Sequence, residues 1–308
     1  MPQKVILVAD PGIDTAFAIA IALHDPKLDV LGLLATAGNV SADQATSNVH
    51  ILIDQLDPPK WPRLGAAPPV NYEIDGTALH GPDGLGGVTV ECSKLHAPTP
   101  SDKLLVELVH EAPKEVTVVN LGPLTVFARA LDRDPELPTL IDRLVCLGGA
   151  WHEHGNASAV AEFHFACDPV SARRVLRSGA AITLIPLDVS RKIVFSPTDL
   201  LELPGGETGP CRFLRQIVPF GIRATANHYG VEGFQLKDVL GVFALVRPGA
   251  LTTRAVYVDV ETQGELTRGM TVVDLRPTPA GRPNVHLATG VDVDEVRSYI
   301  ERTLSGSV

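Results

Sequence analysis

The sequence predicts an α/β protein in which a mostly parallel central sheet is flanked by helices. Two observations predict this class. Several short, nearly continuous apolar segments end at turn residues and are followed by stretches typical of helices. Strands without polar alternation are buried on both faces, as in parallel sheets covered by helices. The 308 residues contain no repeats and no plausible linker, so residues 1–308 are expected to form a single domain.

The first two thirds of the chain alternate between expected strands and helices. Residues 5–9 predict a buried strand, Asp10-Pro11-Gly12 predicts a tight turn, and the Ala-rich run that follows predicts a helix over residues 15–24. The further expected strands cover residues 28–36, 116–121, 144–149 and 181–187. The further expected helices cover residues 41–56, 101–111, 124–131 and 169–178.

The last third of the chain has a different pattern. It is mainly helical from about residue 195 to 250, with late strands expected at 256–261 and 270–274 and a closing helix at 292–304. Proline and glycine are frequent in residues 57–75 and 276–284. Both stretches are therefore expected to be loops within the domain.

The charge and the cysteines limit the classes of partner and compartment. A formal net charge of −10 without a basic stripe argues against nucleic acid and an anionic membrane surface. No apolar run approaches the roughly 20 residues of a membrane span, and no secretory signal precedes the first strand, so we expect a cytoplasmic protein. The cysteines lie far apart and are expected to be isolated packing residues: Cys92, Cys146, Cys167 and Cys211.

Polar side chains follow the expected strands at their carboxyl ends. Asp10 and Asp14 come after the first strand, and a polar connection follows the strand that ends in Gly148-Gly149. Because α/β proteins bind ligands at this edge of the sheet, carboxylates and amides there would hold a polyhydroxylated ligand or a hard cation. The further residues expected at this edge are Asn39, Asn120, Asn156, Glu162, His164 and Asp188.

Several of these residues also have a structural explanation when taken alone. Asp14 would serve equally well as the N-cap of the helix at 15–24, and a lone His164 is more often a satisfied polar residue. Asp10 is harder to explain in this way, because a carboxylate after a fully apolar strand is costly without a partner. The glycine-dense loop that begins at His80 would let the backbone approach a ligand closely, although this signal is not specific.

The motifs together resemble the inosine-uridine preferring nucleoside hydrolase family. The family pattern D-x-D-P-G-x-D-D-A corresponds to residues 8–16, which read Val-Ala-Asp-Pro-Gly-Ile-Asp-Thr-Ala. The similarity extends over nearly the whole chain. It continues through Gly38-Asn39, the loop at 80–86, and residues 122–125, 147–149, 155–163, 187–189, 260–264 and 269–274.

The resemblance implies a hydrolase of purine or pyrimidine salvage that cleaves the N-glycosidic bond of a ribonucleoside to ribose and free base. It implies a Ca²⁺ ion that holds the ribose hydroxyls and the attacking water, with Asp10 as metal ligand and general base. Asp238 and the carbonyl of Leu121 would be further metal ligands. The residues implied for binding the nucleoside are Asp14, Asn39, His80, Asn156, Glu162, Phe163 and Tyr229. The family also implies a homodimer or homotetramer.

Five positions depart from the family pattern: Val8, Thr15, Leu121, His164 and Lys237. At the expected metal position Thr15 offers a neutral hydroxyl in place of a carboxylate, and Lys237 adds an ammonium in place of a histidine. We therefore expect calcium to bind weakly or not at all, since ligand charge largely sets its affinity. Lys237 either lies in or beside the vacated metal position, paired with Asp10 and Asp238, or points to solvent.

The same departures leave the catalytic acid open. Lys237 replaces the histidine thought to protonate a purine leaving group, but the ordinary pKa of lysine lies far above the neutral range. His164 is the other candidate, because histidine is the usual proton donor near neutral pH, and it would either act as the acid or fill the volume of the family's asparagine.

Two functions follow, an active N-ribosyl hydrolase or a silent relative that binds a ribose-containing ligand without hydrolysing it. A phosphatase of the haloacid dehalogenase type is excluded because no second Asp follows Asp10 by two residues. A dinucleotide enzyme is excluded because no G-x-G-x-x-G follows the first strand.

Overall fold

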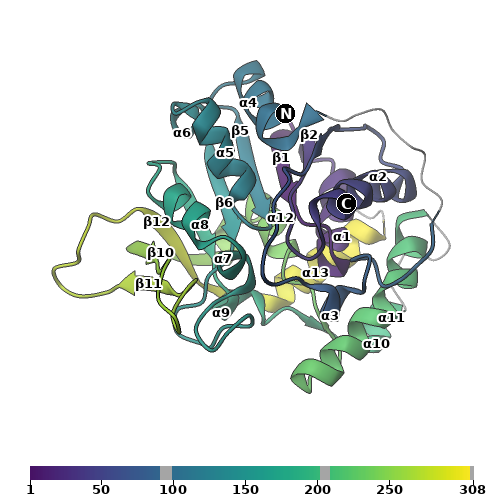
Figure 1. The fold of residues 1–308 in the computed structure, drawn as a ribbon. Coiled ribbons are helices and arrows are strands. Elements are labelled where there is room, and N and C mark those ends of the chain that lie inside the picture. Colours follow the sequence, from purple (N-terminus) through teal and green to yellow (C-terminus); the bar gives the residue numbers. More distant parts are fainter. Residues whose placement is uncertain (91–98, 202–208, 306–308) are drawn as a thin grey trace.

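The computed structural model describes residues 1–90, 99–201 and 209–305. In this part of the chain, ten strands form one sheet in the order β11-β10-β12-β7-β6-β5-β1-β2-β3-β4 (Figure 1). These strands are β1 (Gln3–Ala9), β2 (Leu28–Ala35), β3 (Arg63–Ala66), β4 (Thr99–Pro100), β5 (Val116–Leu121), β6 (Arg143–Leu147), β7 (Ile182–Ile185), β10 (Leu251–Val260), β11 (Thr271–Asp274) and β12 (Val285–Val291). A small second sheet pairs β8 (Val194–Phe195) with β9 (Phe234–Gln235).

Helices lie on both faces of the large sheet (Figure 1). They are α1 (Ile13–His24), α2 (Ala42–Leu56), α3 (Thr77–His80), α4 (Ser101–Glu111), α5 (Thr125–Arg133), α6 (Leu137–Leu140), α7 (Phe163–Cys167), α8 (Pro169–Leu176), α9 (Leu187–Ser190), α10 (Pro197–Leu201), α11 (Gly209–Tyr229), α12 (Val239–Val246) and α13 (Val293–Leu304), with a 3₁₀ turn, η1, at Pro248–Ala250. The long helices expected from the sequence are present, with ends that differ by a few residues.

Most neighbouring strands of the large sheet are parallel. β1 pairs in parallel with β2 on one side and with β5 on the other. β10 is antiparallel to both of its neighbours, β11 and β12. The α/β class with a mostly parallel sheet, which the apolar runs predict, is therefore confirmed.

The side chains of β1 alternate between two hydrophobic cores. Val5, Leu7 and Ala9 belong to the core formed with α1, α2, α11, α12 and α13. Ile6 and Val8 belong to the core on the other face, formed with α4, α5 and α8. Because helices cover both faces, residues 5–9 are all fully buried. This double burial explains why the strand is an unbroken apolar run, and it places the end of β1 at the centre of the molecule.

Several elements lie where the sequence predicts none, and β12, β3 and α7 are the clearest examples. β12 contains exposed His286 and Thr289, but it is held between antiparallel β10 and parallel β7. β3 is a four-residue strand inside the proline-rich stretch expected to be irregular, and it pairs with β2. α7 forms where the sequence predicts a connection. In each case the neighbouring elements stabilise a segment whose own pattern is weak.

The segment after β7 also differs from the expectation. The strand predicted over residues 181–187 ends at Ile185, and α9 follows it. The carboxylate of Asp188 in α9 accepts hydrogen bonds from the backbone N–H groups of residues 151–153 at 2.8, 2.9 and 3.1 Å. Asp188 therefore stabilises the loop after β6 and does not face a ligand, which corrects its placement among the candidate ligand-binding residues.

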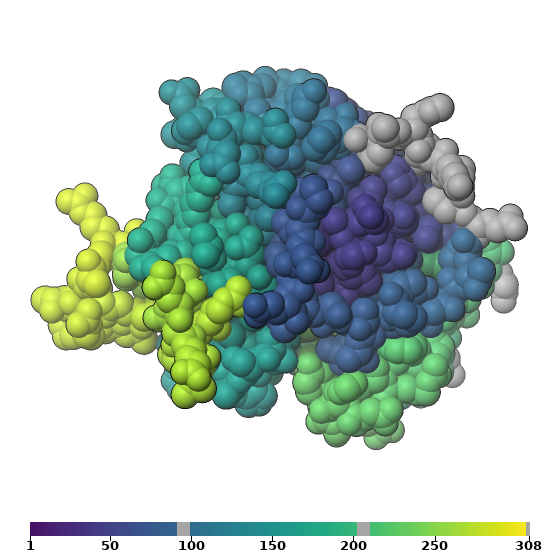
Figure 2. Space-filling model, viewed as in Figure 1, coloured from purple at the N-terminus to yellow at the C-terminus, as the bar shows by residue number. Residues whose placement is uncertain are grey.

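A segment of the late chain projects from the body of the molecule. In Figures 1 and 2 it includes β11 and the chain on either side of it. Leu266, Val272 and Leu275 in this region are exposed. No helix in the described ranges is long and apolar enough to traverse a bilayer.

The remaining expectations concern the cysteines and the helical region after β8. Cys146, Cys167 and Cys211 are buried, and none of them forms a disulfide with another described cysteine, as expected for packing residues. Cys92 lies outside the described residues. So do residues 202–208, which are part of the stretch expected to be mainly helical.

Candidate functional site

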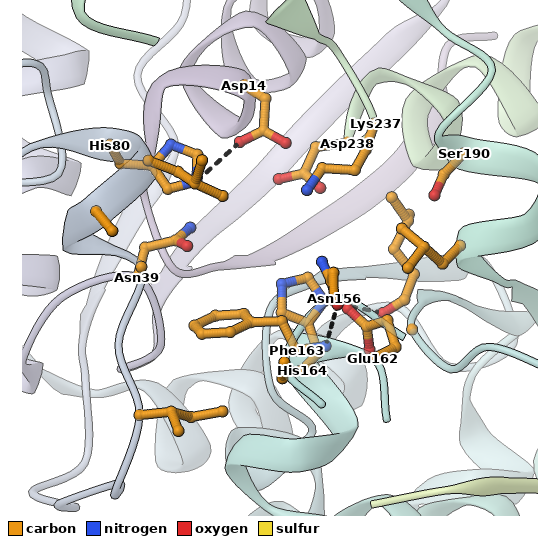
Figure 3. Close-up of a pocket in the computed structure, with 18 of the residues that line it drawn as sticks. Asp14, Asn39, His80, Asn156, Glu162, Phe163, His164, Ser190, Lys237 and Asp238 are labelled. Carbon is orange, nitrogen blue, oxygen red and sulfur yellow. Dashed lines mark hydrogen bonds and ion pairs between the residues drawn. The ribbon is translucent and has the colours of Figure 1, made fainter. Parts of the chain in front are cut away.

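A pocket of about 330 Å³ opens at the carboxyl ends of the central strands (Figure 3). Segments that follow β1, β2, β6 and β7 meet there with α3 and with the residues just before α12. The predicted site residues that line it are Asp14, Asn39, His80, Asn156, Glu162, Phe163, His164, Tyr229, Lys237 and Asp238. Asp10, Thr15 and Leu121 are fully buried and do not line the pocket. Leu121 ends β5, opposite Ala9 of β1.

The carboxylate of Asp10 lies behind the pocket and is held by the backbone after β2. Asn39 N–H donates to Asp10 Oδ2 at 3.0 Å, and Asn39 Nδ2 donates to the Asp10 carbonyl oxygen at 2.8 Å. Gly38 permits this approach, because a Cβ there would lie 2.0 Å from Asp10 Oδ2. Asp10 Oδ1 accepts no hydrogen bond from any described residue. Burial raises the pKa of Asp10 well above its ordinary value, and the charges of Asp238 and Asp14 raise it further.

A buried hydrogen bond joins the start of α1 to the residues before α12. Thr15 Oγ1 donates to Asp238 Oδ2 at 2.6 Å, although the two residues are 223 positions apart. Burial raises the pKa of Asp238, and the charge of Asp14 acts in the same direction. The hydrogen bond from Thr15 and the charge of Lys237 oppose this shift without cancelling it. Asp238 is thus a pocket carboxylate with one oxygen already used by a donor from the protein.

His80, at the end of α3, is buried against the start of α1. Its Nδ1 accepts a hydrogen bond from Ile13 N–H at 3.0 Å, so the ring hydrogen is on Nε2, which lies 3.9 Å from Asp14 Oδ1. Burial lowers the pKa of His80 to about 4, although the charge of Asp14 opposes the shift. α1 is capped by Gly12, where a Cβ would lie 2.9 Å from His80 Nδ1. The alternative that Asp14 caps this helix is therefore wrong.

The loop after β6 presents one carboxylate and one amide to the pocket. Glu162 Oε2 accepts hydrogen bonds from Gly149 N–H at 2.9 Å and from Phe165 N–H at 3.2 Å, and so caps α7. Asn156 Oδ1 accepts from Phe163 N–H at 2.9 Å. These contacts fix both side chains and leave Glu162 Oε1 and the Asn156 amide hydrogens available to a ligand.

His164 lies among the carboxylates. Its Nδ1 donates to the Leu147 carbonyl oxygen at 3.2 Å and is 3.7 Å from Glu162 Oε1. Its Nε2 is 3.7 Å from Asp10 Oδ2. The imidazole therefore bridges the space between a buried carboxylate and one that lines the pocket.

Lys237 points into the pocket from the segment before α12 (Figure 3). The sequence left open whether this side chain lies at the expected metal position, paired with Asp10 and Asp238, or points to solvent. It lines the pocket, but its expected pairing with these two carboxylates is not seen in the described residues. Its ammonium makes no hydrogen bond or close ion pair with any residue that the structure describes. Burial lowers the pKa of Lys237, but the negative charges of Asp14 and Asp238 outweigh burial, so that the pKa is raised overall. The side chain is a charged donor without a close partner of its own.

Some pocket residues were not singled out from the sequence. Ser190 lies two positions after Asp188, and the helical turn of α9 directs the serine to the pocket. His228 precedes Tyr229 at the end of α11. Asn120, expected at the site, instead donates from its amide to the Gly122 carbonyl in the turn after β5. The remaining lining residues are Ile74, Asp75, Gly76, Ala78, Leu79, Leu147, Gly148, Ala157 and Leu187.

The donor atoms at this site do not fit a calcium ion. Calcium takes six to eight oxygen ligands, several of them carboxylates. The described residues contain no group of three or more His, Cys, Asp or Glu side chains arranged to hold a metal ion. The hydroxyl of Thr15 donates its hydrogen to Asp238. The ammonium of Lys237 interacts with the charges of Asp14 and Asp238, and its positive charge would repel a calcium ion bound near them. No catalytic step is therefore assigned to a metal.

An open, mostly parallel sheet with carboxylates and amides gathered at its strand ends is typical of an α/β protein that binds a polar ligand at this edge. A model of the family described as inosine-uridine preferring nucleoside hydrolase matches residues 5–298. The chain belongs to this family.

The similar proteins agree with this assignment. The chain is 34% identical over 319 residues to "Probable uridine nucleosidase 2" of Oryza sativa subsp. japonica, covering 98% of this chain and 93% of that one. It is 34% identical over 312 residues to "Non-specific ribonucleoside hydrolase RihC" of Escherichia coli (strain K12 / DH10B), covering 99% of each chain.

Two solved structures are similar over 99% of both chains. The structure entitled "Plant nucleoside hydrolase - PpNRh1 enzyme" has a TM-score of 0.92 and 29% identity. The purine-preferring ribonucleoside hydrolase from Gardnerella vaginalis has a TM-score of 0.91 and 28% identity. The likeness therefore covers the fold from end to end.

Proposed function

We propose that this protein hydrolyses the N-glycosidic bond of a ribonucleoside to give ribose and the free base. The observation that carries the proposal is the convergence of Asp14, Asn39, Glu162 and Asp238 on one pocket, in a chain whose family and relatives are nucleoside hydrolases. Their oxygen and amide atoms match the hydroxyl groups of a ribose. A silent relative would have no need of so many buried carboxylates, because an unpaired buried charge is costly.

Asp10 is the proposed general base. Its Oδ1 is buried and accepts no hydrogen bond from the described residues, while Oδ2 is fixed by Asn39. Oδ1 would take a proton from the water whose oxygen bonds to the anomeric carbon. The bond from that carbon to the base nitrogen would break, and the base would leave with the electron pair and take a proton from solvent at the open side of the pocket, next to the exposed Tyr229. A raised pKa makes this carboxylate a stronger base, as such a role requires near neutral pH.

The other carboxylates would stabilise the transition state. Cleavage of an N-glycosidic bond builds positive charge on the ribosyl ring, and a preorganised cluster of negative charge lowers the energy of that state. Asp14 and Asp238 line the pocket and are buried. Their hydrogen bonds to sugar hydroxyls would hold the ring over Asp10.

We propose one role for His164 and another for the aromatic residues that line the pocket. His164 contacts Asp10 and Glu162, so we assign it to positioning the carboxylates and not to protonating the base. His228, Tyr229 and Phe163 offer aromatic rings to the pocket, where Phe163 also packs edge to face against His164, and these three residues are proposed to touch the base. Relatives are named for uridine, for purines and for non-specific action, so the preference of this chain is left to measurement.

The test is ribose release from a panel of purine and pyrimidine ribonucleosides, with Asp10→Asn as the control. We expect the native protein to release ribose from at least one member and Asp10→Asn to be slower by a factor of about 10²–10⁴. Circular dichroism and thermal unfolding establish that both proteins are folded. Absence of ribose release by folded native protein across the panel would overturn the proposal.

Three broader properties are also proposed. Strands from both ends of the chain join one sheet, which supports a single domain over residues 1–308. The exposed Leu266, Val272 and Leu275 of the projecting segment support a homodimer or homotetramer. Buried cysteines without a disulfide in the described residues support a cytoplasmic location. Light scattering on purified protein tests the second of these.

A further inference from the structure

The innermost part of the pocket holds a cluster of negative charge. Asp14 and Asp238 both act electrostatically on Asp10, and these three residues are at most 3% exposed. Buried carboxylates that repel one another need a positive partner, because little water is present to screen their charges. The question is which positive group the chain provides.

The hydroxyl of Thr15 faces this cluster as a hydrogen-bond donor, where a calcium site would need a negatively charged ligand. Its hydroxyl hydrogen is directed to Asp238 Oδ2 at 2.6 Å. This hydrogen bond uses one lone pair of Asp238 Oδ2, so a metal ion bound to that oxygen would share it with the hydroxyl. Thr15 also brings no charge, and calcium affinity falls as the number of charged ligands falls. The hydroxyl of Thr15 therefore gives Asp238 a neutral donor and adds no negative charge that would attract a metal ion.

Lys237 is the positive group that the same segment supplies. It precedes Asp238, lines the pocket, and is acted on by the charges of Asp14, Asp238 and Glu162. Its ammonium has no hydrogen bond or close ion pair within the described part of the chain. The ammonium lies among carboxylates and directs its N–H groups into the pocket, so it can donate hydrogen bonds to an oxygen atom of a ligand.

We propose that the Lys237 ammonium is the resident cation of this active site and holds a ribose hydroxyl there, so that the enzyme works without calcium. The activity part of this inference rests on the proposed function, whereas the calcium part does not. The ammonium would donate to a hydroxyl oxygen of the ribose, and that hydroxyl would donate its hydrogen to Asp14 or Asp238. The ribose hydroxyl then has both a donor and an acceptor, and the carboxylate has a hydrogen-bond partner. Asp10 and the attacking water act on the N-glycosidic bond.

This role differs from that of a proton donor to the leaving base. A lysine that protonates the base would be needed equally for a ribonucleoside and its deoxy analogue. A lysine that binds a sugar hydroxyl matters only when that hydroxyl is present. Substrates that lack the 2′- or the 3′-hydroxyl therefore distinguish the two roles.

The first experiment measures calcium binding directly, by isothermal titration of chelator-treated native protein. We expect no binding in the micromolar range, and no change in the melting temperature with added calcium or with EDTA. The double variant Thr15→Asp/Lys237→His restores a carboxylate and removes the ammonium, and calcium should bind to it and raise its melting temperature. Micromolar calcium binding by the native protein would overturn the proposal, as would a folded double variant that gains none.

The second experiment compares Lys237→Met with a matched variant, Lys27→Met, which removes an exposed lysine before β2. Loss of a charged hydrogen bond should lower kcat/KM for the ribonucleoside by about 10- to 100-fold. The activity on either the 2′-deoxy or the 3′-deoxy analogue should then fall much less, while Lys27→Met should change neither substrate. EDTA should leave native activity unchanged.

The outcomes separate this inference from the proposed function. Equal losses by Lys237→Met on the ribonucleoside and both deoxy analogues would overturn hydroxyl binding and favour a proton donor. Activity that disappears with EDTA and returns with calcium would overturn the metal-free site. If folded native protein cleaves no nucleoside, the proposed function fails, and the calcium titration still decides whether Thr15 and Lys237 exclude the ion.

Discussion

The two sides of the pocket are built differently. The pocket floor, which we define as Asp14, Asn39, His80 and Asp238 together with Asp10 buried directly behind them, is at most 5% exposed. Hydrogen bonds donated from α1 hold the side chains of His80 and Asp238, and the backbone after β2 donates a hydrogen bond to Asp10. The pocket rim, which we define as Phe163, His228 and Tyr229, is more open, with Tyr229 exposed to 43%. We expect sugar binding to depend on the buried, hydrogen-bonded groups of the floor and base choice to depend on the more exposed side chains of the rim.

The largest expected effect comes from moving a floor carboxylate without removing it. In Gly38→Ala the new Cβ would lie 2.0 Å from Asp10 Oδ2, so the carboxylate or the backbone must shift. A displacement of this size should lower kcat by about 100-fold. Gly249→Ala is the matched control, because nothing lies within 4 Å of its Cβ. Equal kcat values for the two variants would show that activity does not depend on the exact position of the Asp10 carboxylate. The floor would then be no more sensitive to substitution than the rim.

The second prediction concerns the pH dependence of stability. Because burial lowers the pKa of His80 to about 4, the folded protein binds a proton at this residue less readily than the unfolded chain does. His80 makes its full contribution to the free energy of unfolding above about pH 6.5. This contribution, up to about 3 kcal/mol, is lost as the pH falls toward 4.

His80→Asn tests this prediction, because it retains an acceptor for Ile13 N–H but does not titrate. Urea unfolding at pH 7 and pH 4.5 should show a larger loss in the native protein than in His80→Asn. The same loss in both proteins would mean that His80 does not set the acid sensitivity of the floor.

A smaller effect is expected from the link between α1 and α12. Thr15→Val removes the hydroxyl that donates to Asp238 and leaves a buried carboxylate oxygen without its donor. The free energy of unfolding should fall by about 1–3 kcal/mol. Thr15→Ser retains the hydroxyl and should lose less. Urea unfolding of the two variants provides the comparison, and identical stabilities would show that the hydrogen bond contributes little to the floor.

The smallest effect should come from the rim. Tyr229→Ala removes an exposed side chain at the end of α11, so the melting temperature should stay within a degree or two of the native value. The ratio of kcat/KM for purine and pyrimidine nucleosides should change by about tenfold or less. A loss on all substrates as large as that of Gly38→Ala would place Tyr229 with the floor and not with the rim.

The sequence predicts the elements that carry the site better than it predicts their contacts. The apolar run at residues 5–9 requires cover on both faces, and this is sufficient to infer β1 and a parallel sheet. β12 is different, because its exposed His286 and Thr289 break the pattern. Its pairing with β7 and β10 supplies the stabilisation, and such pairing partners are not visible in a local stretch of sequence.

The sequence by itself determined which chemical groups stand at the strand ends, because apolar runs and turn residues fix where each strand stops. The tertiary structure decided where those groups point. Asp188 turns back to hold the loop after β6, whereas Lys237 enters the pocket. Thr15 meets Asp238 across 223 positions of sequence. Directions of this kind depend on packing between distant segments, and no local pattern of residues encodes that packing.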